Sequence, residues 1–157
     1  RRQRQMCIRD RLPDRPYTAG EWGYVNGKGR STTSEIYNTV DGPVYQTWME
    51  DITEYKIDAP AGTYEVELLM ADVSRPARQQ ANLLGKGDER ASAVSKRFDI
   101  TICGEVVEQN FSPADNNRYL NACRRRYIVN NNDGCIDIRF TPLQGKPVLS
   151  GLKVRRL

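Results

Sequence analysis

The sequence contains no histidine. Histidine is the commonest general base near neutral pH and a frequent metal ligand, so a Ser-His-Asp or Cys-His mechanism is excluded within these 157 residues. The cysteines Cys7, Cys103, Cys123 and Cys135 include no CxxC pair, which argues against a zinc site. Apolar or strand-like sequence around three of them favours buried free thiols, with disulfides as the alternative in an oxidising compartment.

Long apolar runs are also missing. No stretch approaches the roughly 20 residues of a membrane-spanning helix, and no signal peptide is visible. The chain opens with Arg1 and has no initiator Met, so we expect an excised domain or a processed product. Its length predicts a single domain over residues 1–157, with residues 1–16 as a linker plus a first strand.

Charge of one sign is not concentrated in one place. The net charge is +4, but basic residues gather in three separate clusters: Arg1–Arg15, Arg124–Arg126 and Arg155–Arg156. A nucleic-acid interface would favour a basic stripe interleaved with aromatic residues. Aromatic and basic clusters lie in different parts of this sequence, so we expect solvated basic surface and neither a nucleic-acid nor a membrane partner.

Acidic residues give little sign of catalysis or of a metal. A glycosidase needs two carboxylates at a set separation, whereas acidic loop residues are common in any soluble domain. We therefore expect no catalytic residue in this chain. Carboxylates and loop carbonyls could hold a structural calcium ion, although no DxDxDG spacing supports one. No other cofactor is expected.

Alternating apolar residues predict about eight short strands. Residues 53–58 and 63–71 alternate on either side of a turn at residues 59–62, which predicts a β-hairpin. Further strands are expected at residues 97–102, 105–109, 127–131, 135–140 and 148–156, with an opening strand at residues 6–9. Polar segments at residues 72–96 and 112–126 read as long loops. The pattern predicts an all-β fold, a two-sheet β-sandwich of the jelly-roll, galactose-binding-like type.

Aromatic residues are few, 8% of the chain, but several gather in turn-like segments. The first group is Glu21-Trp22-Gly23-Tyr24-Val25-Asn26-Gly27, and the second is Tyr45-Gln46-Thr47-Trp48, preceded by Asp41-Gly42. Tyr37 and Asn38 precede that turn, and Tyr119 and Asn121 are weaker candidates. A pocket for a small ligand combines apolar contact with a few placed polar groups. In the alternative interpretation, Trp22 plugs the core and the second group is a strand with one buried face.

Four segments carry a resemblance to a known family. The runs VYQTWMEDITEYKIDAPAGTYEVELLMAD, RFDITICGEVV and CIDIRFTPLQGKPVLSGLKV resemble malectin and malectin-like carbohydrate-binding domains, and AGEWGYVNG resembles the Trp-Gly-Tyr turn near the start of such domains appended to bacterial, β-galactosidase-like glycoside hydrolases. Tyr45, Gln46 and Thr47 fall on the family's Tyr-Gln-Thr motif, and Tyr24 matches its early aromatic residue. Cys103 and Ser150 stand where the family usually has Asn.

The resemblance implies a non-catalytic carbohydrate-binding module that belongs to a larger glycoside hydrolase and is secreted, periplasmic or at the cell surface. Rings would stack on sugars and polar side chains would bind hydroxyls, so the expected ligand-binding residues are Tyr24, Asn26, Tyr37, Asp41, Tyr45, Gln46 and Trp48. The expected partners are an oligo- or polysaccharide and the parent catalytic domain. The alternative is a packing module between domains, with no ligand of its own.

Overall fold

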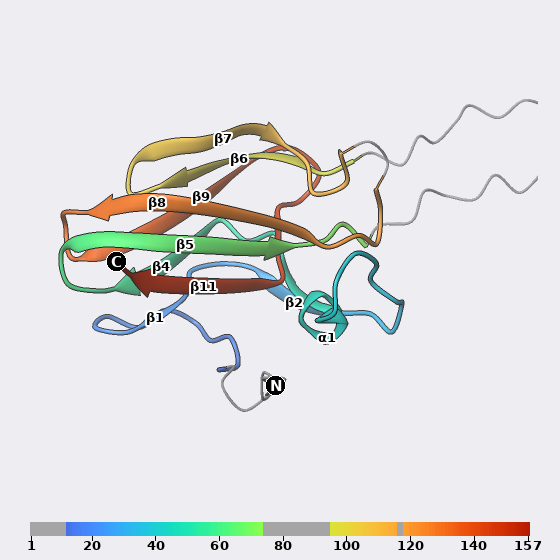
Figure 1. Ribbon diagram of the computed structural model, residues 1–157, viewed down its shortest axis with the longest axis horizontal. Helices are drawn as coiled ribbons and strands as arrows, with labels where there is room; N and C mark the ends of the chain where they lie inside the picture. Colours follow the sequence, from blue (N-terminus) through green and yellow to red (C-terminus); the bar gives the residue numbers. More distant parts are fainter. Residues whose placement is uncertain (1–11, 74–94, 116–117) are drawn as a thin grey trace, which may run out of the picture.

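The computed structural model describes residues 12–73, 95–115 and 118–157, and these form a β-sandwich with one short helix, α1 (Gly42–Tyr45) (Figure 1). The larger sheet holds, in spatial order, β1 (Trp22–Tyr24), β4 (Glu54–Asp58), β9 (Cys135–Gln144), β6 (Arg97–Ile102) and β7 (Glu105–Phe111). The opposing sheet holds β11 (Gly151–Arg156), β5 (Gly62–Met70) and β8 (Cys123–Asn131). A small third sheet holds β10 (Val148–Leu149), β3 (Thr47–Glu50) and β2 (Lys28–Ser31).

The core lies between the two main sheets, and alternation along each strand builds it. Val66 and Leu68 of β5 are fully buried and face Ile100 of β6 and Ile136 and Ile138 of β9 in one cluster. Burying a side chain of this size contributes about 1.5–3 kcal/mol relative to leaving it in water. The predicted all-β sandwich is therefore confirmed, and hydrophobic contact between its sheets holds it together.

Most predicted strands are present with boundaries within a few residues. Phe98, Ile100 and Ile102 point inward from β6 as expected, and β6 pairs with β7 across the turn at Gly104. Leu152 and Val154 of β11 pack against the core as predicted. The predicted last strand is in fact two strands, because β10 pairs with β3 and β11 pairs with β5. The predicted opening strand at residues 6–9 and most of the loop at residues 72–96 lie outside the described residues.

The predicted hairpin between residues 53–58 and 63–71 is wrong. β4 pairs with β1 and β9, whereas β5 pairs with β11 and β8, so residues 59–61 cross from one sheet to the other. Buried Asn131 of β8 holds this arch, donating from Nδ2 to the carbonyl oxygens of Ala59 (2.9 Å) and Pro60 (3.3 Å). The Tyr64 hydroxyl also donates to the Pro60 oxygen at 2.7 Å.

One end of the sandwich is tied together by a buried ion cluster. Lys96, just before β6, places Nζ 3.8 Å from Asp72 Oδ1 and 3.9 Å from Glu50 Oε1. Asp72 follows β5, and Glu50 ends β3. The cluster thus joins chain segments that belong to all three sheets. No helix among the described residues is long and apolar enough to cross a membrane.

Candidate functional site

The Trp-Gly-Tyr segment forms a structural strand. Trp22 and Tyr24 of β1 are half-buried against the core, and the Arg15 guanidinium carbon lies 4.5 Å from the Trp22 ring centroid. A Cβ added at Gly23 would lie 2.6 Å from the backbone of Pro16, so glycine is needed for the close approach of residues 15–17. The core interpretation of Trp22 therefore fits this packing, and Asn26 is exposed in the turn that follows.

The second aromatic group lies at α1 and β3. Tyr45 is 2% exposed at the end of α1, and Asp41 is the residue before that helix. Gln46 donates from Nε2 to the Ser34 carbonyl oxygen at 3.0 Å, which ties the helix to the preceding loop. Trp48 is half-buried on β3, and no described acceptor lies within hydrogen-bond distance of its buried Nε1.

The two groups do not come together. β2 pairs with β3 so that Lys28 opposes Glu50 and Ser31 opposes Thr47. Asn26 therefore lies near the Glu50 end of this pair, and Gln46 lies at the other end, about 10 Å of strand away. In Figure 1, β1 lies to the left of the view and α1 to the right. The two aromatic groups therefore do not form a single pocket.

A hollow of about 440 Å³ opens beside α1. It lies between the chain leaving β7, the chain entering β8 and the loop before α1. The residues that line it are Asn38, Tyr45, Ser112, Pro113, Asp115, Arg118, Asn121, Ala122, Cys123, Arg124 and Arg125. Its volume falls in the range of small-molecule sites. Of the residues predicted to bind ligand, Tyr45 is the one in this lining.

Tyr37 borders the hollow through its backbone. Its N–H donates to the Leu120 oxygen at 2.7 Å, and its oxygen accepts from Ala122 N–H at 2.9 Å. This short parallel bridge lays residues 37 and 38 beside the lining residues Asn121 and Ala122. The Tyr37 side chain is 54% exposed. Asn38 adopts a φ of 62°, a left-handed conformation that Asn tolerates better than most residues.

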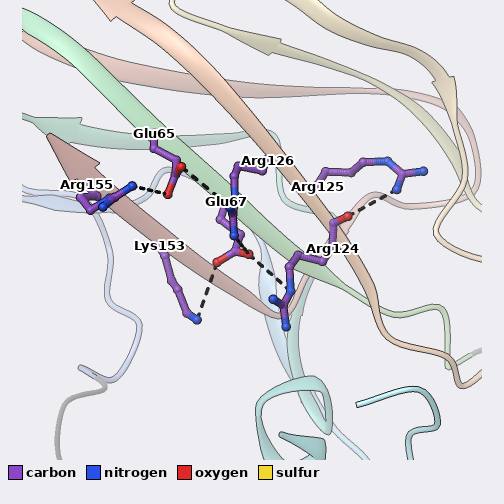
Figure 2. A network of polar contacts seen from close by, with 7 residues as sticks. All are labelled: Glu65, Glu67, Arg124, Arg125, Arg126, Lys153 and Arg155. Atoms are coloured by element: carbon purple, nitrogen blue, oxygen red, sulfur yellow. Dashed lines mark hydrogen bonds and ion pairs between the residues drawn. The ribbon is translucent and has the colours of Figure 1, made fainter. Parts of the chain in front are cut away.

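An ion network lies on the outer face of the β11-β5-β8 sheet (Figure 2). Tyr45 connects the hollow to this network through Arg124. Burial raises the pKa of the Tyr45 hydroxyl, and the hydrogen-bonded Arg124 guanidinium partly opposes that rise. Arg124 Nε in turn lies 3.3 Å from Glu67 Oε1. We call this the outer-face network, and its members are Glu65, Glu67, Arg124, Arg126, Lys153 and Arg155.

Two further arginines complete the cationic wall of the hollow. Arg125 Nε lies 3.3 Å from Glu108 Oε1 on β7, and its guanidinium carbon lies 5.2 Å from the Phe111 ring centroid. Arg118 is exposed, and no carboxylate of the described residues forms an ion pair with its guanidinium. The hollow therefore offers guanidinium, amide and hydroxyl groups and the Asp115 carboxylate, with one largely covered aromatic ring.

Sequence reasoning missed the arginines because it placed residues 112–126 in a loop. β8 begins at Cys123, four residues before the predicted start, so Arg124 and Arg126 are strand residues with neighbours on β5. The run Arg124-Arg125-Arg126 shows no alternation of polar and apolar residues, so no local signal extended the strand to Cys123. Asn38 and Asn121 were only minor candidates in the sequence, and both line the hollow.

Metal ligands are not grouped in the described part of the chain. Within residues 12–73, 95–115 and 118–157, no three Cys, Asp or Glu side chains are placed to hold a metal ion. A structural calcium ion stays a prediction that this geometry does not support. Cys103, Cys123 and Cys135 are free thiols, each half-buried, and Cys7 lies outside the described residues.

A family model described as "Malectin domain" matches residues 11–151, most of the sequence. The chain belongs to the malectin domain family. The resemblance predicted from the sequence is therefore confirmed. Malectin domains are non-catalytic carbohydrate-binding folds. A search of curated proteins finds no match.

Solved structures similar to this malectin domain include a bacterial enzyme and plant receptors. The β-glucuronidase of Bacteroides uniformis is 41% identical, with a TM-score of 0.79 over 93% of this chain and 16% of the enzyme. The plant receptor-like kinase FER is 16% identical, with a TM-score of 0.61 over 88% of this chain and 35% of that protein. The ANXUR2 extracellular domain of Arabidopsis thaliana is 16% identical, with a TM-score of 0.58 over 87% and 41%.

The chain thus spans about a sixth of the length of the glucuronidase. The plant receptors share its fold. The sequence led us to expect a β-galactosidase-like context for this malectin domain, whereas the similar bacterial enzyme is a glucuronidase.

Proposed function

We propose that this malectin domain binds carbohydrate without catalysis, as an accessory part of a larger glycoside hydrolase, and that the sugar occupies the hollow beside α1. The observation that carries the proposal is the hollow itself, about 440 Å³ in volume and lined by amide, hydroxyl and guanidinium groups and the Asp115 carboxylate. Sugar hydroxyls need such donors and acceptors, and the exposed Tyr37 ring at the border offers an apolar surface for a sugar face.

The similarity to the B. uniformis β-glucuronidase supports the accessory role, because the matched region is a small part of that enzyme. A binding module raises the local concentration of the attached catalytic domain near its substrate. A glucuronidase acts on glucuronides, so glycans that contain glucuronic acid are the first candidates for the parent's substrate. An extracytoplasmic location, as in the ANXUR2 extracellular domain, would give this module access to such glycans.

Titration calorimetry of the isolated chain against neutral and acidic oligosaccharides tests the proposal. Tyr37→Ala removes the exposed ring, and Asn38→Gly removes an amide while keeping the backbone conformation that glycine also tolerates. Both variants should weaken binding by about tenfold, the equivalent of one lost contact of ~1.4 kcal/mol. Asn132→Ala, in the exposed turn between β8 and β9, is the control and should bind like the wild type. Asn26→Ala reports whether the loop after β1 also contacts the ligand, as the sequence predicts.

The packing alternative has one supporting observation. That alternative expects Trp22 and Trp48 to be buried or to lie in an apolar patch; both are half-buried, and neither lines the hollow. A pure packing module would bind no oligosaccharide in the titration. Absence of heat for every glycan would therefore contradict carbohydrate binding and favour the packing role.

A further inference from the structure

The wall of the hollow is unusual for a site that binds neutral sugar by ring stacking. Tyr45 is its one aromatic lining residue among those described, and with 2% exposure it presents little ring surface. Three arginines line the hollow instead, Arg118, Arg124 and Arg125, and each carries a guanidinium group. The chemistry that these groups recognise best is a planar carboxylate.

The guanidinium groups of Arg124 and Arg125 are held in place, and each keeps N–H donors that these contacts do not use. Arg124 uses Nε on Glu67, and Arg125 uses Nε on Glu108 and Nη1 on the Arg124 carbonyl oxygen at 3.3 Å. Figure 2 shows the contact of Arg125 with Arg124 and that of Arg124 with Glu67. A guanidinium carries five N–H donors, and the side chains of Arg124 and Arg125 are 56% and 46% exposed. Their remaining N–H groups can therefore reach a ligand with little cost in side-chain entropy.

Charge around the hollow also favours an anion. The hollow and the outer-face network together hold six cationic side chains, the network's four plus Arg118 and Arg125. Four carboxylates lie with them among the described residues: the network's two, Asp115 in the lining, and Glu108, the ion-pair partner of Arg125. The difference is a net charge of +2. An anionic group would reduce the mutual repulsion of these cations, whereas a neutral sugar would displace their water without compensating charge.

We propose that the hollow binds a uronic acid residue, with the sugar carboxylate at Arg118, Arg124 and Arg125 and the hydroxyls at Asn38, Ser112 and Asn121. This inference rests on the proposed carbohydrate-binding function and specifies its ligand class. The carboxylate forms charge-assisted hydrogen bonds with guanidinium groups, and these are about twice as strong as neutral ones. The amides of Asn38 and Asn121 and the Ser112 hydroxyl orient the sugar ring. Affinity should fall as salt rises, because the attraction is partly exposed to solvent.

The test uses glucuronate, galacturonate and mannuronate oligosaccharides, each paired with its methyl ester. Esterification removes the charge and keeps the sugar skeleton. At least one acid should bind about tenfold or more tightly than its ester, since hydrogen bonds to charged groups are worth about 1.5–3 kcal/mol. Arg118→Gln should remove most of that preference, because it removes one of the guanidinium groups that bind the carboxylate. Arg139→Gln, an equal loss of charge on the outer face of the other sheet, should keep the preference.

The results separate this inference from the function beneath it. In one outcome, esters or neutral oligosaccharides bind as tightly as the acids, and Tyr37→Ala weakens that binding. This outcome would overturn the uronate assignment and leave the proposed carbohydrate binding intact. If Arg118→Gln and Arg139→Gln reduced the preference for the acid equally, the acid would be attracted to the basic domain in general. That result would also overturn the uronate assignment. Failure of every sugar to bind would overturn both proposals.

Discussion

Replacing Lys96 with Met tests the buried ion cluster that joins the three sheets. Asp72 has a fully buried side chain, and Lys96 Nζ lies 3.8 Å from its Oδ1. At an effective dielectric of about 20, an attraction over that distance is about 4 kcal/mol before desolvation is counted. Removing one partner of a buried pair typically costs about 3–5 kcal/mol, because the other charge stays buried. We expect about 3 kcal/mol, since Glu50 keeps its contact with Arg30.

Equilibrium unfolding in urea measures this loss, provided that the dependence on denaturant concentration is unchanged. Arg30→Met is the matched control, because it removes an exposed cation from the same Glu50 carboxylate at 3.0 Å and should cost less than about 1 kcal/mol. Combining Lys96→Met with Asp72→Asn removes both charges and should recover part of the stability. A Lys96→Met loss no larger than that of Arg30→Met would refute the assigned role of the cluster.

Three further predictions follow from single sites. Burial and the Glu54 carboxyl raise the pKa of Asp137 above its ordinary 3.8, and a raised folded-state pKa means that stability is lost as pH rises through it. Asp137→Asn should therefore raise the melting temperature at pH 7 but not at pH 3, and an equal gain at both would contradict this. Burial raises the pKa of Cys135 to about 11, so at pH 8 it should be alkylated about 100-fold more slowly than an ordinary thiol. Asp58→Asn, which removes the carboxylate charge beside this thiol, should speed the reaction seen by mass spectrometry, and an unchanged rate would exclude Asp58 as a cause. Ile138→Ala should cost about 2–5 kcal/mol in urea unfolding, because Ile138 is fully buried, and a loss below about 1 kcal/mol would contradict its core position.

Most strand positions could be predicted from the sequence, but β1 and β2 were not predicted and one predicted pairing was wrong. Alternation at β5 and β6 reports which side chains are buried, and burial is what the structure confirms. The turn at residues 59–62 has the same composition whether it closes a hairpin or carries the chain between sheets. The decisive contacts come from Asn131, more than 70 residues away, whose amide binds the arch carbonyls. Such long-range hydrogen bonds leave no local pattern.

The candidate site was predictable only in part, for a related reason. The sequence pointed to Tyr37 and Tyr45, because aromatic residues among turn residues are a local signal. It classed the arginines before Tyr127 as solvated surface, because basic residues are usually exposed. Their placement depends on the register of β8 against β5, in which Arg126 opposes Glu67 and Arg124 opposes Leu69. Register is set by the hydrophobic pattern of both strands together.

That register has a consequence for binding. Glu67 lies on the outer face of β5 and is nearly buried by the cations around it, so it acts as an anchor for them. Arg124 reaches from this anchor to the Tyr45 hydroxyl at the hollow. Tyr45, which the sequence assigned to sugar stacking, thus also forms a hydrogen bond that orients the Arg124 guanidinium. If the ligand is a uronate, Tyr45 contributes chiefly by orienting Arg124, and replacing Tyr45 with Phe should weaken acid binding more than ester binding.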